Sequence, residues 1–523
     1  MAGINYTSQT APQGHKAFNG GLNSTAGSLE LQDNESSDLQ NIDFDKFGSL
    51  LKRPGYATVG THITVAGVAA AACDGIHWYE YNNAGTATRK MIHVMNGWLF
   101  TMSDMAGGYA SIGTAAVLTA AKHCDFENFL NKVIITNGTD IPVIWAGAGT
   151  AKNMVVPTSL TSAKFVKQFN NYLFLANVVV NSVVHPSRIY WSRIKDIDNW
   201  DGDQLIDISK DDGTEITGIR VLQDRLVVYK TRAIYNVFFT GDADIPFILP
   251  GGGKSNSAVG CIAPYSIQEV ENGHVFLASD GLYYYDGMNS QKISHKIQYT
   301  FDTSMNTTQH STAVSCVYKR KNKYLLALSS ADVTPHDRVI VWDYYNNAFS
   351  IYTGMSVSAM TTAFISGTKE QSYFGDYYGC TYLIDSGTND YPFVIATSLN
   401  TLTAIDSYYW TNWKSYDDLC DQKGIPNVYI YYQTSNSILT LGYAYDFDTG
   451  SQYSQTISMA TGTSVYDTAV WDTDIYASSG GAVKRRDLTG RGRVVRFNFS
   501  NNNQGETMQI DGLGTYAHLE TNA

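Results

Sequence analysis

Six basic residues crowd into a short stretch near the C-terminus of an otherwise acidic chain. They are Lys484, Arg485, Arg486, Arg491, Arg493 and Arg496. Arginine forms bidentate pairs with carboxylates and phosphates, so the cluster predicts a subunit interface or a set of phosphate contacts. A solvated strand face produces the same pattern and is the commoner case. The sequence leaves both interpretations open.

Two other segments resemble ligand sites but lack a required residue. Pro250-Gly-Gly-Gly-Lys-Ser255 resembles a phosphate loop, yet the first glycine of that motif would fall at Ile248. The acidic run from Asp196 to Asp203 alternates oxygen ligands, but Trp200 takes the third ligand position of a calcium loop. We interpret the first as a glycine-rich loop and the second as a surface turn, with a nonstandard calcium site as its alternative.

The motifs that mark common enzyme classes are missing from the sequence. It contains no His-Glu-x-x-His, no Gly-x-Ser-x-Gly and no Gly-x-Gly-x-x-Gly after a strand. His123 and His185 have no partners at metal-ligand spacing. We therefore predict no catalytic residues, no cofactor and no metal site. A glycosidase stays open as an alternative, because its two carboxylates need only converge in space.

The cysteines give no sign of a metal or redox motif. They lie at positions 73, 124, 261, 316, 380 and 420 and never form Cys-x-x-Cys. Buried, apolar thiols are the expected state.

The elements that would carry these residues are short strands in a repeat. Runs rich in Val, Leu, Tyr and Phe begin at Asn171, Asp224, Gly273, Asn322 and Gln371, with successive starts 53, 49, 49 and 49 residues apart. Each run is followed by a second, aromatic strand, which makes one hairpin per repeat. A strand repeat near 50 residues is typical of a β-propeller blade. Six to eight blades fit the chain and seven are favoured, with an array of β-sandwiches as the alternative.

The repeat divides the chain into three segments of an all-β protein. Residues 1–60 are polar and turn-rich, which predicts an extended N-terminal arm that orders against the body or a neighbour. Residues 61–398 form the β-propeller. Residues 399–523 lose the repeat and predict a separate, sandwich-like C-terminal β domain with strands at 428–433, 438–445, 456–459 and 494–499.

Composition narrows the class further. The 523 residues carry 36 Lys and Arg against 48 Asp and Glu, and this net charge of −12 argues against an outer surface that grips nucleic acid. Apolar residues make up 44% of the chain, which excludes general disorder. The longest apolar run, from Val65 to Cys73, is far shorter than the roughly 20 residues of a membrane span. With no secretory signal at the N-terminus, we expect a cytoplasmic product without membrane insertion.

Short motifs recur in an order that resembles the β-propeller tail proteins of tailed bacteriophages. The opening carries Gly20-Gly-Leu-Asn23, Asn41-Ile-Asp-Phe-Asp45 and Lys52-Arg-Pro-Gly-Tyr56. Further along, the matches are Asn137-Gly-Thr-Asp140, Ile189-Tyr-Trp-Ser192, Ile216-Thr-Gly-Ile219, Ser279-Asp-Gly-Leu-Tyr283 and Gly490-Arg-Gly-Arg-Val-Val-Arg-Phe497 before Ile510-Asp-Gly512. Each motif is short, and their order over most of the chain carries the resemblance.

In short-tailed phages this family is the tail nozzle, so the resemblance implies a structural virion protein and not an enzyme. It implies a homo-oligomeric ring, commonly a hexamer, that closes the distal tail channel, retains packaged DNA and opens for ejection. The implied partners are other copies of the chain, the tail adaptor ring with other tail proteins, and genomic DNA that passes the lumen without sequence-specific binding. The implied location is the virion tail, after assembly in the host cytoplasm.

Two alternatives differ in class. One is a propeller that binds or hydrolyses glycans, and the other is a head-tail or minor tail protein of a tailed phage.

For the nozzle, an acidic lumen would repel DNA phosphates and let the duplex slide, as the net charge permits.

Overall fold

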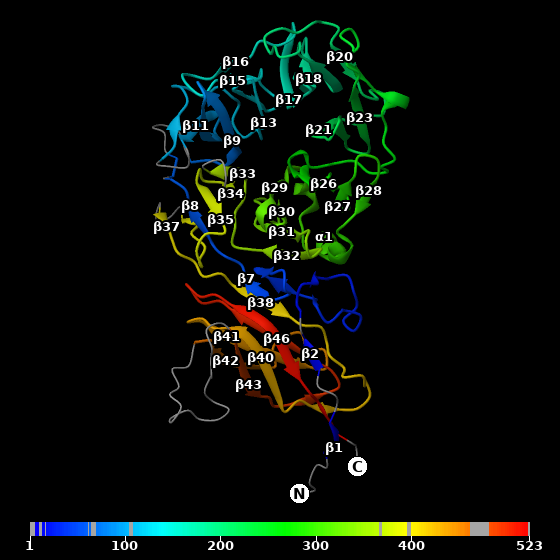
Figure 1. Cartoon of the computed structure of the whole chain (residues 1–523), viewed down its shortest axis with the longest axis vertical. Helices are drawn as coiled ribbons and strands as arrows, with labels where there is room; N and C mark the ends of the chain where they lie inside the picture. The colour runs from blue at the N-terminus through cyan, green and yellow to red at the C-terminus, as the bar shows by residue number, and fades with distance from the viewer. Residues whose placement is uncertain are drawn as a thin grey trace.

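The computed structural model describes residues 6–9, 13–15, 17–60, 62–63, 70–103, 108–365, 369–394, 399–460 and 481–520. The start of the apolar run at Val65 lies outside these residues. Figure 1 shows a ring of blades joined to a second β unit, with both chain ends at the far end of that unit. Within the described residues the one α-helix is α1 (Gln298–Thr303). No described helix is long and apolar enough to span a membrane.

The propeller has seven blades, each a four-stranded antiparallel sheet, as the sequence repeat favoured. The first three are β9 (Cys73–Asn83), β10 (Thr86–Met95), β11 (Trp98–Ser103) and β12 (Ala110–Ser111); β13 (Asp125–Phe129), β14 (Lys132–Thr136), β15 (Val143–Trp145) and β16 (Lys152–Asn153); and β17 (Leu160–Phe169), β18 (Tyr172–Val180), β19 (Val183–Trp191) and β20 (Leu205–Asp207).

The next three blades follow the same pattern along the chain. They are β21 (Ile216–Leu222), β22 (Arg225–Lys230), β23 (Ile234–Phe239) and β24 (Phe247–Ile248); β25 (Gln268–Val270), β26 (Gly273–Ala278), β27 (Gly281–Tyr285) and β28 (Ser290–Lys292); and β29 (Val314–Tyr318), β30 (Lys323–Leu328), β31 (Arg338–Asp343) and β32 (Ala348–Tyr352). Short 3-10 helices occur at η1 (Pro250–Gly252), η2 (Pro264–Ser266), η3 (His295–Ile297), η4 (Thr307–Thr312) and η5 (Lys319–Lys321).

The seventh blade closes the ring with a strand from the N-terminal segment. Its order is β33 (Ala359–Ile365), β34 (Lys369–Gly375), β35 (Thr381–Ile384) and β8 (Tyr56–Thr58). Tyr56 is buried, donates its hydroxyl to the Gly354 carbonyl at 2.8 Å and packs edge-on against Phe374 and Tyr382. β33 also contacts β9, so the last blade meets the first. The segment expected as an arm therefore ends inside the propeller.

The hairpins of the sequence repeat are the second and third strands of blades three to seven. Strand β18 contains the run that begins at Asn171, and β34 the run that begins at Gln371. Asp74-Gly-Ile-His-Trp-Tyr79 and Asp280-Gly-Leu-Tyr-Tyr-Tyr285 are similar in sequence, but they occupy different places in their blades, because β9 is a first strand and β27 a third strand.

The C-terminal unit is a sandwich whose sheets both include strands of the arm. One sheet has the order β42 (Tyr453–Ser458), β41 (Ile438–Tyr445), β45 (Val495–Asn501), β38 (Ser407–Trp410), β5 (Leu39–Gln40). The other has the order β43 (Gly481–Asp487), β40 (Asn427–Gln433), β46 (Gln509–Thr515), β7 (Leu50–Lys52), β6 (Ile42–Phe44), and β2 (Gln13–His15) pairs with β46.

Smaller sheets complete the described strands. A third sheet of the C-terminal unit joins β1 (Tyr6–Gln9), β47 (His518–Glu520), β39 (Lys423–Gly424) and β44 (Arg491–Gly492). Two-stranded sheets pair β3 (Gly21–Leu22) with β4 (Glu35–Ser36), and β36 (Phe393–Val394) with β37 (Leu399–Asn400).

One hydrophobic core runs from blades five and six through the arm into the sandwich. Leu277 and Leu326 of the blades belong to the same buried cluster as Phe499 and Ile510 of the sandwich. Phe18 of the arm belongs to this cluster too, with its ring 5.4 Å from the ring of Tyr409 and edge-on to it. The arm is therefore a packed element between the two units.

The seam between blades one and seven should respond to acid. His93 on β10 is fully buried, and its Nδ1 lies 3.1 Å from Thr381 Oγ1 on β35. Burial lowers the pKa of His93 to about 3. An unfolded histidine titrates near pH 6.5, so this side chain's contribution to stability is present above about pH 6.5 and is lost as pH falls toward 3.

We expect His93→Gln, which does not titrate, to remove this part of the acid sensitivity. The measurement is the melting temperature of both proteins from pH 7 to pH 4. As pH falls, the melting temperature of the wild type should decrease more than that of the variant. Parallel curves over this range would show that His93 is not the titrating group.

Candidate functional site

The first strand of every blade contributes to a cavity of about 410 Å³ on the propeller axis. Asp74 to His77 of β9, Asp125 of β13, Lys167 of β17 and Arg220 of β21 line one side of it. Propeller geometry points the first strand of each blade at the axis, so side chains distant in sequence meet there. This cavity is the first place where an axial ligand or catalytic pair would lie.

Charged side chains in this cavity are paired across blades. Lys167 Nζ lies 2.6 Å from Glu127 Oε2, and Arg220 Nη2 lies 3.4 Å from Asp125 Oδ1. Asp125 also accepts the backbone N–H of Val166 at 3.1 Å. Burial raises the pKa of Glu127, while the Lys167 ammonium opposes that rise. The two carboxylates of β13 thus tie blade two to blades three and four, which favours a structural role over that of a glycosidase pair.

The axial space is divided in two. A second cavity of about 490 Å³ shares only His123 and Tyr265 with the first, so these two residues stand between them. The Tyr265 hydroxyl donates to the His123 carbonyl at 3.0 Å. The major groove of a DNA duplex alone is about 12 Å wide, so a duplex does not fit through cavities of this size.

Buried groups near the division have shifted pKa values. Burial raises the pKa of Asp74 to about 7, although the backbone N–H of Ala121 donates to this carboxylate at 3.3 Å. Burial lowers the pKa of His123 to about 4, which keeps that imidazole neutral near pH 7. Among the described residues no group of three or more His, Cys, Asp or Glu side chains could hold a metal ion.

The six basic residues of the predicted cluster are spread over several strands. Lys484, Arg485 and Arg486 lie on β43, the edge strand of the six-stranded sheet, where Arg485 pairs with Asp487 at 3.2 Å. Arg491 on β44 and Arg493 after it are exposed, and Arg493 Nε donates to the Cys420 carbonyl at 3.1 Å. These five remain at or near the surface.

Arg496 departs from the sequence-based prediction of a surface contact. It lies on β45 and is 9% exposed, with its guanidinium carbon 4.0 Å from the ring centre of Trp410 and 4.7 Å from that of Trp413. Its Nη2 donates to the Asp448 carbonyl at 2.7 Å. Arg496 is a core residue of the sandwich, and cation–π contact with two tryptophans accounts for its place there.

The other two candidate segments are turns. In the acidic run, Asn199 Nδ2 donates to Asp196 at 2.5 Å, and Asp201 pairs with Arg193 at 2.7 Å, so these carboxylates serve the turn itself. The glycine-rich segment forms η1 (Pro250–Gly252), and no described α-helix follows it as a phosphate loop would need. Of the six cysteines, five are buried free thiols and Cys420 is exposed.

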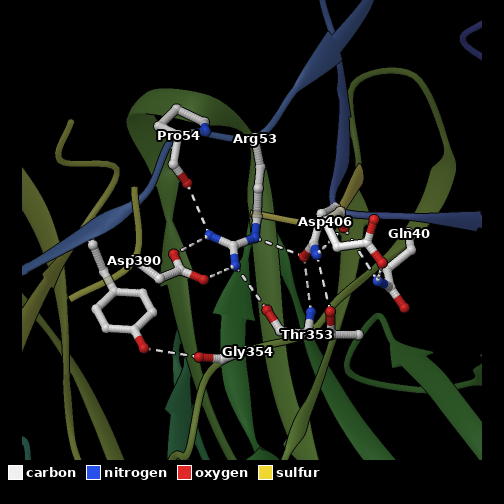
Figure 2. Close-up of polar contacts among 9 residues, drawn as sticks. Gln40, Arg53, Pro54, Thr353, Gly354, Asp390 and Asp406 are labelled. Carbon is white, nitrogen blue, oxygen red and sulfur yellow. Dashed lines mark hydrogen bonds and ion pairs between the residues drawn. The ribbon is translucent and has the colours of Figure 1, made fainter. Parts of the chain in front are cut away.

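A buried polar site around Arg53, here called the joint, lies where arm, propeller and sandwich meet. Figure 2 shows the guanidinium of Arg53 surrounded by acceptors. Nη1 and Nη2 donate to the two carboxylate oxygens of Asp390 at 2.8 and 2.6 Å, and the other three N–H groups donate to Asn41 Oδ1 and the carbonyls of Pro54 and Thr353. All five guanidinium donors are used, and both side chains of the ion pair are almost fully buried.

Neighbouring contacts extend this joint into the sandwich and blade six. Asn41 Nδ2 donates to the Asp406 carbonyl at 2.7 Å, just before β38. Lys323 of β30 pairs with Asp43 of β6 at 2.6 Å, and the Tyr352 hydroxyl also donates to Asp43. Burial opposes ionisation of Asp43, but the Lys323 ammonium outweighs it and holds the pKa of Asp43 below its usual value.

Sequence reasoning did not select the residues of this joint as a site. Arg53 lies in Lys52-Arg-Pro-Gly-Tyr56, a motif noted only for its resemblance. Its partner Asp390 is 337 residues away, and nothing in the local sequence around Asp390 marks it.

Comparison with known proteins bears on the fold. No protein-family model matches the chain, and no curated protein does. Similar solved structures include PorZ, a surface component of the type-IX secretion system of Porphyromonas gingivalis, at 12% identity and a TM-score of 0.38; the match covers 68% of this chain and 42% of PorZ. BamB from Moraxella catarrhalis matches at 11% identity and a TM-score of 0.37, and the match covers 64% of this chain and 97% of BamB. The WD40 β-propeller domain of Doa1 matches at 8% identity and a TM-score of 0.37, and the match covers 63% of this chain and 96% of that domain. The sheet topology defines the class: a seven-bladed β-propeller with an attached β-sandwich.

The Arg53 ion pair should be essential for the joint. Arg53→Met leaves Asp390 buried without its partner, which costs about 3–5 kcal/mol in comparable sites. We expect a lower melting temperature and faster proteolysis of the arm. The double variant Arg53→Met/Asp390→Leu should recover part of the loss, because it removes both buried charges.

Arg193→Met is the matched control, since Arg193 also pairs with an aspartate but is exposed on blade three. Its melting temperature should match that of the wild type. Equal melting temperatures for Arg53→Met and Arg193→Met would contradict the importance of the buried pair.

Proposed function

We propose that this protein is the tail nozzle of a short-tailed bacteriophage. In this role several copies form a ring that closes the distal tail channel, retains packaged DNA and opens for genome ejection. One observation carries the proposal: two motifs of the sequence resemblance supply the residues that build the joint around Arg53. The motifs Asn41-Ile-Asp-Phe-Asp45 and Lys52-Arg-Pro-Gly-Tyr56 contain Asn41, Asp43, Arg53 and Tyr56, whose side chains fasten the arm to the propeller and sandwich.

A rigid joint suits a ring that must hold DNA. The buried core that continues from the blades into the sandwich makes the chain resist bending between its units. A propeller presents short, protected strand edges, so copies can pack side by side without open-sheet aggregation. One heterologous interface repeated around the axis is enough to close such a ring.

The DNA channel of this nozzle is the lumen between copies. The two axial cavities of one propeller, divided by Tyr265 and His123, are too small for a duplex. The net charge of −12 favours a lumen that repels phosphate and lets DNA slide past it.

Copy number and position in purified virus particles test the proposal. Quantitative mass spectrometry should find a few copies of the chain per particle, and antibody-labelled electron microscopy should place one closed ring at the tail tip. Absence from particles would overturn the proposal and favour a glycan-binding propeller. A location at the head-tail junction would favour the other structural role.

The exposed part of the basic cluster should contribute to the contact between copies. Arg491 and Arg493 are exposed, and an acidic chain offers many carboxylates to a neighbour. We expect Arg491→Glu/Arg493→Glu to prevent ring formation in analytical ultracentrifugation without changing the melting temperature. Lys152→Glu, at an exposed lysine of blade two, is the control and should leave ring formation intact. If the double variant assembles normally but retains DNA poorly, these arginines contact DNA instead.

A further inference from the structure

The outer face of the six-stranded sheet carries two tyrosines of β40 beside the glycines of β46. Along β40, Val428, Ile430 and Tyr432 are buried in the sandwich core, so the alternate residues Tyr429, Tyr431 and Gln433 lie on the opposite face. Tyr431 is 46% exposed. Its cross-strand partners are Val483 of β43 and Gly512 of β46, in the lower unit of Figure 1.

Glycine on β46 leaves the ring of Tyr431 open on one flank. Gly512 is paired with Tyr431, and a Cβ added at Gly514 would lie 3.8 Å from the Tyr431 ring. The glycines therefore put no side chain between this ring and the neighbouring strand. An exposed aromatic ring of this kind offers an apolar surface and a polar hydroxyl tip to a ligand.

A β-bulge sets a carboxylate between two glutamine amides. The pairing of β40 with β46 shifts register between Tyr431 and Tyr432, which leaves Asp511 as the extra residue of β46. Bulges redirect a side chain and are frequent beside binding sites. Asp511 accepts from Gln433 Nε2 at 2.7 Å and from Gln509 Nε2 at 3.0 Å. These bonds fix the planes of both amides before any ligand arrives.

A cavity of about 380 Å³ adjoins the two glutamines, between sandwich, arm and propeller. Its wall is rich in uncharged polar side chains, namely Thr388, Gln433, Thr434, Ser435, Thr507 and Gln509. The Ser435 hydroxyl oxygen is buried and has no hydrogen-bond partner in the protein. An unsatisfied buried hydroxyl is costly, and a ligand hydroxyl in the cavity would supply the missing partner.

We propose that this face and cavity form a binding site for a saccharide chain. One sugar ring stacks on Tyr431, and the hydroxyls of the next bind the amides of Gln433 and Gln509 and the hydroxyl of Ser435. Residues two apart on a strand lie about 7 Å apart, so the aromatic ring and the amides serve successive parts of one extended ligand. Planar amides, hydroxyls and an open aromatic ring together match a polyhydroxylated ligand.

The carboxylates of the site decide against a phosphate-bearing ligand. Asp511 lies between the two amides, and Glu506 lines the cavity. Lys52 and Arg53 line the cavity too, but the Arg53 donors are all used by Asp390 and its neighbours. The Lys52 ammonium donates to Asn501 Oδ1 and to the Asn503 carbonyl. A phosphate group would be repelled by both carboxylates, whereas sugar hydroxyls can donate to them. The proposal does not depend on the nozzle role, because it concerns a face of the sandwich whichever particle or compartment holds the chain.

Binding to a glycan array of microbial polysaccharides tests the proposal with the full-length protein. The strongest hit, as a purified oligosaccharide, is then titrated by calorimetry. We expect Tyr431→Ala and Gln433→Leu each to weaken binding at least tenfold, and Tyr431→Phe to retain it because the ring remains. Tyr299→Ala removes another well-exposed tyrosine, on α1, and should bind as the wild type does.

Melting temperatures of all variants establish that each is folded. Retention of no glycan by the wild type would overturn the proposal, and so would binding that survives both Tyr431→Ala and Gln433→Leu. Binding of single-stranded DNA of similar length in preference to every glycan would also overturn it, because the site would then be a nucleic-acid face.

Discussion

The buried guanidinium of Arg53 is the interaction on which the arrangement of the two units depends. A charge taken out of water is tolerated only where its partners are complete. Here the acceptors come from the arm, from the end of blade six and from the segment after blade seven, and Asn41 connects them to the start of the sandwich. No acceptor can be withdrawn without leaving a buried donor unsatisfied. The propeller, arm and sandwich must therefore come together in one arrangement.

The arm turns this local constraint into a property of the whole chain. Its strand β8 closes the propeller, while β5, β6 and β7 complete the two sheets of the sandwich. A ring closed by strands from both ends of its sequence cannot open without breaking that pairing. Because the same short segment also contributes Phe18 to the shared core, the sandwich is not tethered by a linker but held by packing. Packing of this kind resists movement of one unit against the other, which is what the nozzle role proposed above requires.

The parts that sequence predicts are those encoded by local patterns. Strands such as β26 and β30 are buried along their whole length, mostly apolar and preceded by turn residues, so their period is visible. Strand β10 shows no such pattern in its first half, because four of the five residues from Thr86 to Lys90 are polar and none of the five is buried. The arm strands are two to four residues long, too short to show alternation. Arg53 and Asp390 meet only through the fold, and the position of Arg496 between two tryptophans depends on packing between strands that sequence does not reveal.

The axial cavity of the propeller and the outer face of the sandwich are both polar, but they differ in whether their polar side chains all have partners. This difference distinguishes a structural site from a candidate binding site. Around the axial cavity Glu127 and Asp125 of blade two are matched by cations from blades three and four, so the network gains little from a ligand. On the sandwich face the Asp511 carboxylate orients two amides, while the Ser435 hydroxyl is left buried without a partner. Polar groups whose hydrogen bonds are complete stabilise a fold. Oriented polar groups that still lack a partner keep hydrogen-bonding capacity for a ligand. The ion pairs around the propeller axis therefore fit a structural role, and the unpartnered hydroxyl beside the oriented amides is the reason that the proposed saccharide site lies on the sandwich.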